Sequence, residues 1–219
     1  MHQSHDDFAF EPVRGLPEAL PPGERILWQG SPDPWRLAVE AFKLRWVAGY
    51  FAVLAVGRVA ASASERPLGE ALAHAVPFLA IGAVACAVIG AIAWVQARAT
   101  VYTLTNRRVG MRIGAALTMT LNLPYGQIEA ARLDLRRGGT GTIAFALPET
   151  TRFSHVMTWP HVRPWHLART EPALRCIRDA AAVARTLADA AEARRTEPAV
   201  SRRPAAAQPP APVHAFAAE

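Results

Sequence analysis

A long uncharged stretch occupies the middle of the chain, at residues 71–97. As a helix rising about 1.5 Å per residue it would span about 40 Å, whereas a bilayer core needs only about 20 residues. A buried core helix of a soluble protein is the alternative, but such helices rarely run uninterrupted for so long. The pattern therefore predicts a membrane-spanning helix.

A second apolar stretch, residues 46–64, is interrupted only by Arg58. An arginine at the centre of a span costs about 2.5–3.5 kcal/mol on insertion. Because Arg58 lies nearer the second end, its side chain can reach toward the headgroup layer. Residues 65–70 form a short polar turn before the next stretch. We therefore predict a hairpin of two antiparallel spans.

Basic residues flank the outer ends of this hairpin and nearly avoid its turn, which holds Arg66 alone. They are Arg36, Lys43 and Arg45 before the first span, and Arg98, Arg107, Arg108 and Arg112 after the second. The positive-inside rule then predicts two passes with both termini in the cytoplasm.

An apolar stripe precedes the first span, since Trp35, Val39, Phe42 and Trp46 recur at helical spacing. The stripe predicts an amphipathic helix over residues 35–45 that lies in the membrane interface. The alternative is an ordinary helix on the surface of a soluble domain.

After residue 98 the pattern changes to short β-type stretches that turn residues separate. Candidate strands are residues 99–104, 108–113, 117–123, 128–135, 142–147 and 153–158, with residues 25–30 as one more upstream of the hairpin. Short strands at this spacing are typical of an antiparallel barrel or sandwich. Thr170 and Pro172 predict the start of a helix whose apolar stripe continues to about residue 195.

The predicted fold is a membrane-anchored α+β protein. A two-helix transmembrane hairpin is inserted after the first strand of a seven-stranded antiparallel barrel, which a C-terminal helix follows. The predicted divisions are residues 1–34 (N-terminal cytoplasmic segment with the first strand), 35–45 (interfacial helix), 46–97 (hairpin), 98–195 (barrel and C-terminal helix) and 196–219 (an Ala- and Pro-rich tail, predicted to be disordered).

Composition adds a basic balance to this picture. Of the 219 residues, 51% are hydrophobic and 19% are charged, and the formal net charge is +6. A basic chain suggests nucleic acid or an anionic membrane surface as a partner. The hairpin flanks account for much of this charge, so nucleic acid is the less favoured partner. The two cysteines form no metal-binding spacing.

Two motifs resemble bacterial pleckstrin-homology-like membrane proteins. They are Gly-Glu-Arg-Ile-Leu-Trp-Gln-Gly-Ser-Pro at residues 23–32 and Tyr-Thr-Leu-Thr-Asn-Arg-Arg-Val at residues 102–109. The pleckstrin-homology barrel has seven strands and a C-terminal helix, as in the predicted fold. Residues 10–18, 121–124 and 159–165 further resemble the PuhB family of photosynthetic-complex assembly proteins of purple bacteria. This resemblance covers about residues 8–195.

The resemblance implies a membrane assembly factor for the photosynthetic reaction centre and its core light-harvesting complex, in the bacterial inner (intracytoplasmic photosynthetic) membrane. Its implied partners are reaction-centre or core light-harvesting subunits, with anionic membrane lipids and a second copy of the chain as further candidates. The alternative is a pleckstrin-homology-like protein that binds lipid headgroups or acts in envelope stress. No catalytic triad, carboxylate pair or nucleotide fingerprint occurs in the sequence. We therefore expect no enzymatic activity, no cofactor and no metal site.

The segment Trp-Pro-His-Val-Arg-Pro-Trp at residues 159–165 is the densest group of aromatic and polar residues. Tryptophan and arginine are enriched at the energetic centres of protein interfaces. Candidate partner-binding residues are Trp159, His161, Arg163, Trp165 and Arg58. The alternative for the segment is a connection whose tryptophans pack on the end of the barrel.

Two other groups of residues suggest contacts. Asn106, Arg107 and Arg108 are candidates for binding a lipid headgroup, or they form a simple turn in which asparagine is tolerated. Gly82, Cys86 and Gly90 repeat small residues every four positions in the second span. Such a repeat favours close helix packing, with the first span, a second copy or a client subunit as the neighbour.

Overall fold

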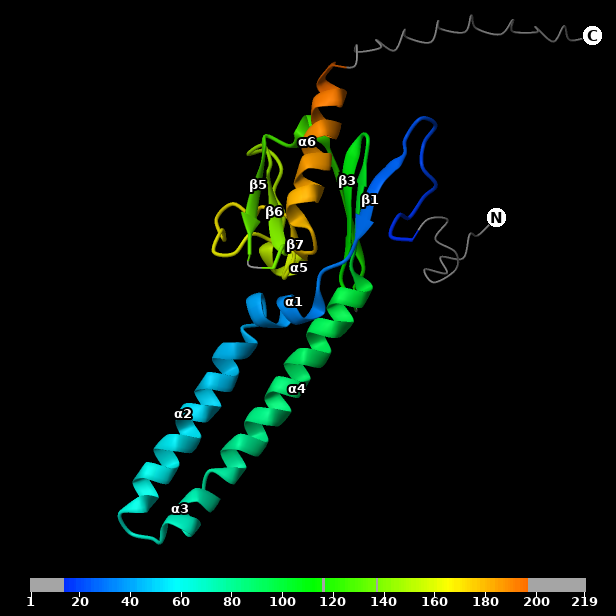
Figure 1. Cartoon of the computed structure of the whole chain (residues 1–219). Helices are drawn as coiled ribbons and strands as arrows, with labels where there is room; N and C mark the ends of the chain where they lie inside the picture. The colour runs from blue at the N-terminus through cyan, green and yellow to red at the C-terminus, as the bar shows by residue number, and fades with distance from the viewer. Residues whose placement is uncertain (1–13, 116, 137, 197–219) are drawn as a thin grey trace, which may run out of the picture.

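The computed structural model describes residues 14–115, 117–136 and 138–196. Within these ranges the chain has three parts: a helical stalk, a short helix at its top, and a head of two sheets (Figure 1). The predicted disordered tail lies outside the described residues, except for Thr196, which ends the last helix.

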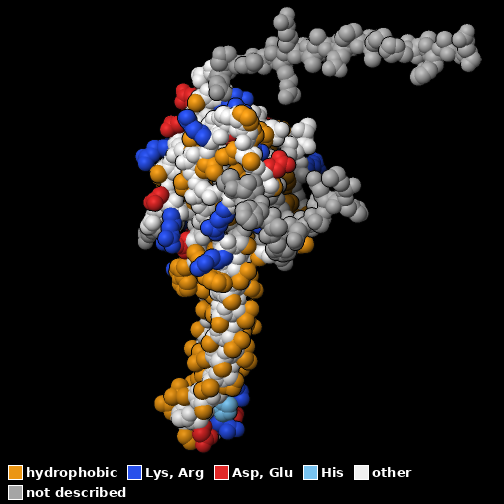
Figure 2. All heavy atoms as spheres, turned by 90° about the vertical axis from the view of Figure 1, so that its right-hand side faces the viewer, with side chains coloured by type: hydrophobic (Ala, Val, Ile, Leu, Met, Phe, Trp, Pro, Cys, Tyr) orange, Lys and Arg blue, Asp and Glu red, His pale blue; other side chains and the backbone are white. Residues whose placement is uncertain are grey.

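The stalk is a helical hairpin. It consists of α2 (Leu44–Ala63), the short α3 (Leu68–Ala73) and α4 (Val76–Ala99). Two helical stretches, Leu44–Ala63 and Leu68–Ala99, are long and apolar enough to cross a membrane, which confirms the two predicted apolar helices. Hydrophobic side chains cover the visible face of the stalk, and charged side chains gather at its tip and on the head (Figure 2). An exposed apolar surface of this kind suits a lipid environment.

The helix α1 (Pro34–Glu40) lies between stalk and head. The side chain of Asp33 caps it by accepting a hydrogen bond of 3.0 Å from the backbone N–H of Arg36. Leu37 and Ala38 form its buried face. The predicted helix over residues 35–45 is shorter in the structure, because Lys43 adopts a left-handed conformation with φ 58°, and a new helix begins after it.

The change of direction at Lys43 divides the apolar stripe that was predicted for residues 35–46. Val39 and Phe42 pack into a small cluster with Ala38, Leu44 and Ala93. In contrast, Trp35 and Trp46 are exposed (62% and 76%). One continuous apolar face does not form, since the chain changes direction before Leu44.

The head consists of antiparallel sheets of four and three strands. The first sheet has the order β1 (Ile26–Gly30), β2 (Val101–Thr105), β3 (Arg108–Ile113) and β4 (Met119–Pro124). A 3₁₀ turn, η1 (Tyr125–Gln127), leads to the second sheet of β5 (Ala130–Leu135), β6 (Gly141–Ala146) and β7 (Ala173–Ile177). The predicted pairing of the first strand across the membrane insertion is present, because Gly30 lies opposite Tyr102.

The predicted single barrel is not observed. No hydrogen-bonded ladder joins β4 to β5 in the described chain, so β5 is an edge strand, and all six of its residues are exposed. The C-terminal helix α6 (Ala180–Thr196) packs along the two sheets (Figure 1). The main core lies between them and includes Tyr102, Met111, Phe145 and Leu187.

Two predicted elements are wrong. Residues 153–158 were expected to be a strand, but the structure has a short helix, α5 (His155–Thr158). The helix expected from Thr170 begins only at Ala180, because Leu174 and Ile177 belong to β7. Their spacing of three continues the apolar stripe of α6, so a buried strand and the following helix resemble one helix in the sequence.

Candidate functional site

Residues 159–165 lie where the head meets the stalk. The ring of Trp159 contacts Phe42 edge to face, with centroids 5.0 Å apart. Phe42 belongs to the corner between α1 and α2, so this contact links the segment to the top of the stalk. Trp159 remains 43% exposed.

His161 is buried and belongs to a polar chain that joins several elements. Its Nδ1 lies 2.6 Å from the phenolic oxygen of Tyr102, and its Nε2 lies 3.1 Å from Oγ1 of Thr100. The backbone N–H of Arg175 donates to the Tyr102 oxygen at 3.2 Å. The Thr100 hydroxyl donates to the carbonyl of Gln96 at 2.8 Å.

Only one arrangement of protons satisfies this chain throughout. The Tyr102 oxygen accepts from Arg175 and donates to Nδ1 of His161. The Nε2–H of His161 then donates to Thr100, whose hydroxyl donates to α4. Burial and, to a smaller extent, the nearby charge of Arg175 lower the pKa of His161 to about 3. Burial also raises the pKa of Tyr102. Both side chains are therefore neutral at physiological pH.

The consequence for His161 is a structural role. Its side chain is 1% exposed, and both ring nitrogens have partners, so it offers no surface to a protein partner. It anchors residues 159–165 to the junction of α4 and β2.

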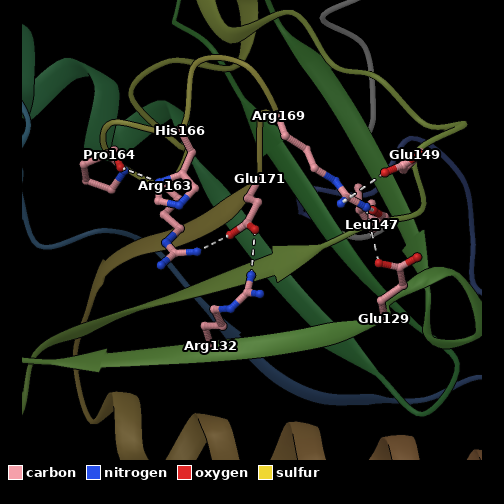
Figure 3. Close-up of polar contacts among 9 residues, drawn as sticks. All are labelled: Glu129, Arg132, Leu147, Glu149, Arg163, Pro164, His166, Arg169 and Glu171. Atoms are coloured by element: carbon pink, nitrogen blue, oxygen red, sulfur yellow. Dashed lines mark hydrogen bonds and ion pairs between the residues drawn. The ribbon is translucent and has the colours of Figure 1, made fainter.

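Arg163 is held by a buried carboxylate (Figure 3). Glu171, whose side chain is 7% exposed, accepts from Arg163 at 3.0 Å and from Arg132 of β5 at 2.6 Å. Burial raises the pKa of Glu171, but the hydrogen bonds and charges of the two arginines outweigh this effect and leave it below its usual range. The shared carboxylate fixes the segment after Trp159 against the second sheet.

Arg169 also holds the connection between β6 and β7 in place (Figure 3). It donates to the carbonyl of Leu147 at 2.6 Å. It also forms ion pairs with Glu129 (3.4 Å) and Glu149 (3.9 Å). The connection between β6 and β7 is therefore held at its start, through Arg169, and near its end, through Glu171.

Exposed apolar side chains are concentrated in this connection. Trp165 is 86% exposed, and Leu167 is 68% exposed. Val156 and Met157 of α5 are exposed as well (84% and 65%). Trp165 was among the predicted candidates, whereas Val156 and Met157 were not, because a strand at residues 153–158 implied that alternate side chains were buried. Leu167 lies just after the predicted segment and had no signal of its own. Large apolar side chains that face solvent together are typical of interaction sites.

A groove of about 800 Å³ lies beside Trp165. One wall consists of the end of α1 and the first turn of α2, including Lys43, Arg45 and Trp46. The opposite wall is the outer face of the second sheet. The groove therefore lies at the level where the stalk enters the head.

The predicted headgroup site at Asn106, Arg107 and Arg108 lies elsewhere. Strand β2 leaves the end of α4 and runs away from the stalk, so the turn after Thr105 lies at the far end of the sheet (Figure 1). Asn106 accepts from the N–H of Arg25 (2.9 Å) and donates to the carbonyl of Gly23 (3.0 Å). The turn thus binds the segment before β1.

The two arginines of this turn differ. Arg108 pairs with the buried carboxylate of Glu24 at 2.8 Å, whereas Arg107 is exposed. The turn therefore lies at the end of the head opposite the stalk (Figure 1).

The three small residues of α4 face different surroundings. A Cβ on Gly82 would lie 2.7 Å from Cβ of Phe51 in α2, so this glycine permits close packing of the hairpin. Cys86 packs against the cluster around Ala38 and Leu44. Nothing lies within 4 Å of a Cβ on Gly90. A spacing of four rotates only about 40° around a helix at each step, so the three residues lie along one stripe of α4 whose neighbours change along the helix.

Arg58 lies in the last two turns of α2. It is exposed, and its side chain makes no ion pair within the described residues. Its backbone carbonyl accepts from the hydroxyl of Ser62 at 3.0 Å.

Comparison with known proteins agrees with this architecture. Residues 44–191 match the bacterial PH domain family, and the chain belongs to that family. It is also similar to a protein of Rhodobacter capsulatus described as an uncharacterized 23.7 kDa protein in the puhA 5′ region, with 46% identity over 205 residues. The match covers 93% of this chain and 96% of the relative. No solved structure matches the chain.

Proposed function

We propose that this chain is a non-enzymatic membrane assembly factor of the PuhB family, which acts on the photosynthetic reaction centre and its core light-harvesting complex. The relative from Rhodobacter capsulatus carries the name of puhA, a photosynthesis gene, in its description. High identity over nearly the full length of both chains supports a shared photosynthetic context.

The observation that carries the proposal is the exposed apolar surface of the connection between β6 and β7, to which Val156, Met157, Trp165 and Leu167 contribute. The contact between Trp159 and Phe42 holds the connection that bears it close to the stalk. A membrane-embedded client could therefore contact α2 or α4 within the bilayer and this surface just outside it. Arg58, which has no ion pair in the described chain, adds a candidate contact inside the membrane.

The stalk is proposed to cross the inner membrane twice with both termini in the cytoplasm. Lys43 and Arg45 precede α2, and Arg98 lies in the last turn of α4, where it stacks on Trp94 at 5.0 Å. The turn at the other end of the stalk contains Arg66, which is paired with Glu70. This asymmetry supports a cytoplasmic head.

Complementation of a gene deletion tests the assembly function. The host lacking this gene would receive the wild-type chain or Trp165→Ala/Leu167→Ser, and the near-infrared absorbance of assembled complexes would be normalised to the abundance of the chain. We expect low absorbance with the double variant. The matched control is Trp35→Ala, since Trp35 is also exposed (62%) but lies on α1. Wild-type absorbance in both variants would contradict the docking surface, and wild-type absorbance in the deletion strain would contradict the function.

A further inference from the structure

The groove beside Trp165 has an excess of positive charge. Its basic lining residues are Lys43, Arg45, Arg132, Arg136, Arg163 and Arg175, and its acidic lining residues are Glu40 and Asp134. Arg136 pairs with Asp134 at 2.8 Å and lies 3.7 Å from Glu40. As described above, Arg132 and Arg163 share Glu171. Lys43, Arg45 and Arg175 have no ion pair among the described residues.

Arg175 is the most unusual of these three residues. It is only 5% exposed, yet among the described residues its side chain makes a single hydrogen bond, from Nη1 to the carbonyl of Pro160 at 3.3 Å. Its Nε is buried and has no hydrogen-bond partner in this part of the chain. A buried charge without a counterion is strongly unfavourable, so the chain keeps Arg175 at a cost that an external anion would offset.

The position of the groove indicates which anion this is. Lys43, Arg45 and Trp46 lie at the start of α2, where an apolar helix begins. Trp94 and Arg98 mark the corresponding level on α4. Tryptophan and basic residues at the ends of membrane spans lie at the depth of lipid headgroups. The groove therefore opens at the depth of the phosphate layer, with its exposed tryptophans beside the acyl boundary.

We propose that this groove binds the headgroup of an anionic phospholipid. The phosphate takes the place of the missing counterion between Arg175, Lys43 and Arg45, while Trp46 and Trp165 flank the lipid at the membrane surface. Phosphate oxygens accept hydrogen bonds from guanidinium groups readily. The proposal requires insertion of the stalk into a membrane but does not depend on the assembly function.

Lipid binding to the full chain in detergent micelles tests the proposal. Native mass spectrometry would compare retention of phosphatidylglycerol and phosphatidylcholine. We expect one phosphatidylglycerol per chain and a preference of about tenfold or more, because each basic residue near an anionic headgroup contributes about fivefold. Lys43→Gln/Arg45→Gln should abolish most of this preference. Arg107→Gln, an exposed arginine at the far end of the head, is the control and should leave it unchanged.

Thermal unfolding supplies an independent measurement. Phosphatidylglycerol should raise the Tm of the wild-type chain relative to phosphatidylcholine. Arg175→Met removes the buried charge, so it should raise the Tm in phosphatidylcholine and remove the additional rise with phosphatidylglycerol. A purely structural arginine would instead give a lower Tm after substitution.

Several outcomes would overturn the proposal. Equal retention of the two lipids, or an equal loss in Arg107→Gln, would show that the groove is not the site. An equal rise in Tm with millimolar inorganic phosphate alone would identify a site for soluble phosphate. Loss of a bound membrane subunit, but not of lipid, in Lys43→Gln/Arg45→Gln would identify the groove as a protein-binding surface. Because no client is needed for the lipid measurements, they can fail while the assembly function stands.

Discussion

Tyr102 and His161 are 59 residues apart in the sequence, yet the Tyr102 oxygen lies 2.6 Å from Nδ1 of His161 inside the head. Through this contact the hydrogen-bonded chain runs from the backbone of β7 to the last turn of α4. The three side chains between its ends, Tyr102, His161 and Thr100, each both donate and accept. The contact therefore joins the connection that bears Trp165 to the end of a proposed membrane helix.

Replacement of His161 should destabilise the head. His161→Leu leaves the Tyr102 hydroxyl without its acceptor and the Thr100 hydroxyl without its donor, which is expected to cost about 2–4 kcal/mol of unfolding free energy. Denaturant unfolding of the full chain in micelles, followed by tryptophan fluorescence, would measure this loss. His166→Leu serves as the control, because His166 is only partly buried and should change stability by less than about 0.5 kcal/mol. Equal stability of the two variants would contradict the role of the chain.

The same histidine predicts a dependence of stability on pH. Its pKa is lowered from 6.5 to about 3 in the folded state, so the unfolded chain binds a proton first as the pH falls. The contribution of His161 to stability is complete above about pH 6.5 and is lost progressively below it. The slope approaches about 1.4 kcal/mol per pH unit. Unfolding measured between about pH 7 and about pH 5 isolates this group, since the pKa values of Asp33 and Glu171 are lowered. His161→Leu should reduce the slope, and an unchanged slope would assign it to other groups.

Helix packing in the stalk should depend on Gly82 and not on Gly90. In Gly82→Ala the new methyl group meets Phe51 at 2.7 Å, so α2 and α4 must separate at an expected cost of about 1–3 kcal/mol. Gly90→Ala adds a methyl group in open space and should be neutral or slightly stabilising. Thermal unfolding in micelles, with a disulfide crosslink between α2 and α4 as a measure of proximity, would compare them. A loss in Gly90→Ala alone would indicate that a second copy or a client packs on that face.

The hairpin and most strands could be predicted because their signals are local. An uncharged stretch is apolar whatever surrounds it, and the alternation in residues 117–123 identifies a strand half-buried at the edge of a sheet. β7 was missed because it is buried on both faces and lacks alternation. Its residues Leu174 and Ile177 continue the apolar spacing of α6, so the sequence pattern is compatible with either a strand or an earlier start of the helix. Burial of these residues in the folded protein favours the strand.

The candidate site was less predictable, since its chemistry depends on contacts between distant segments. His161 was expected at a surface, but Tyr102 and Thr100 surround it with hydrogen-bonding groups. Arg175 falls within the helix predicted from Thr170, yet it lies buried in β7. No local signal distinguishes a buried arginine from a solvated one, and only the three-dimensional structure shows that its counterion is missing.

Arg58 should matter for the client more than for insertion. Arg58→Leu removes the cost of placing an arginine in a span, so we expect a normal or raised amount of the chain in the membrane. If Arg58 contacts a client helix, the near-infrared absorbance of assembled complexes falls relative to the abundance of the chain. Arg66→Leu is the control, because Arg66 lies in the turn and is paired with Glu70. Wild-type absorbance in Arg58→Leu at equal abundance would assign the guanidinium group to the headgroup layer.

The orientation of the stalk can be tested with introduced cysteines. Leu68→Cys lies at the tip of the stalk and should react with a membrane-impermeant maleimide in intact cells. Glu149→Cys lies on the head, where the native side chain is 89% exposed, and should react only after lysis. Burial raises the pKa of Cys176 to about 12, so Cys176 contributes little background, and Cys86→Ala removes the other native thiol. Labelling of Glu149→Cys in intact cells would place the head outside the cytoplasm.

The connection between the stalk and the head is very short. Thr100 alone separates the end of α4 from the start of β2, and β2 is an inner strand that pairs with both β1 and β3. This connection is therefore too short to act as a flexible linker, and the head cannot rotate independently of α4. With the stalk inserted in a bilayer as proposed, the depth of α4 would set the height of the head above the membrane, and a change in helix tilt would turn the whole head. A client that bends or thickens the surrounding membrane would thereby move Trp165 without touching it.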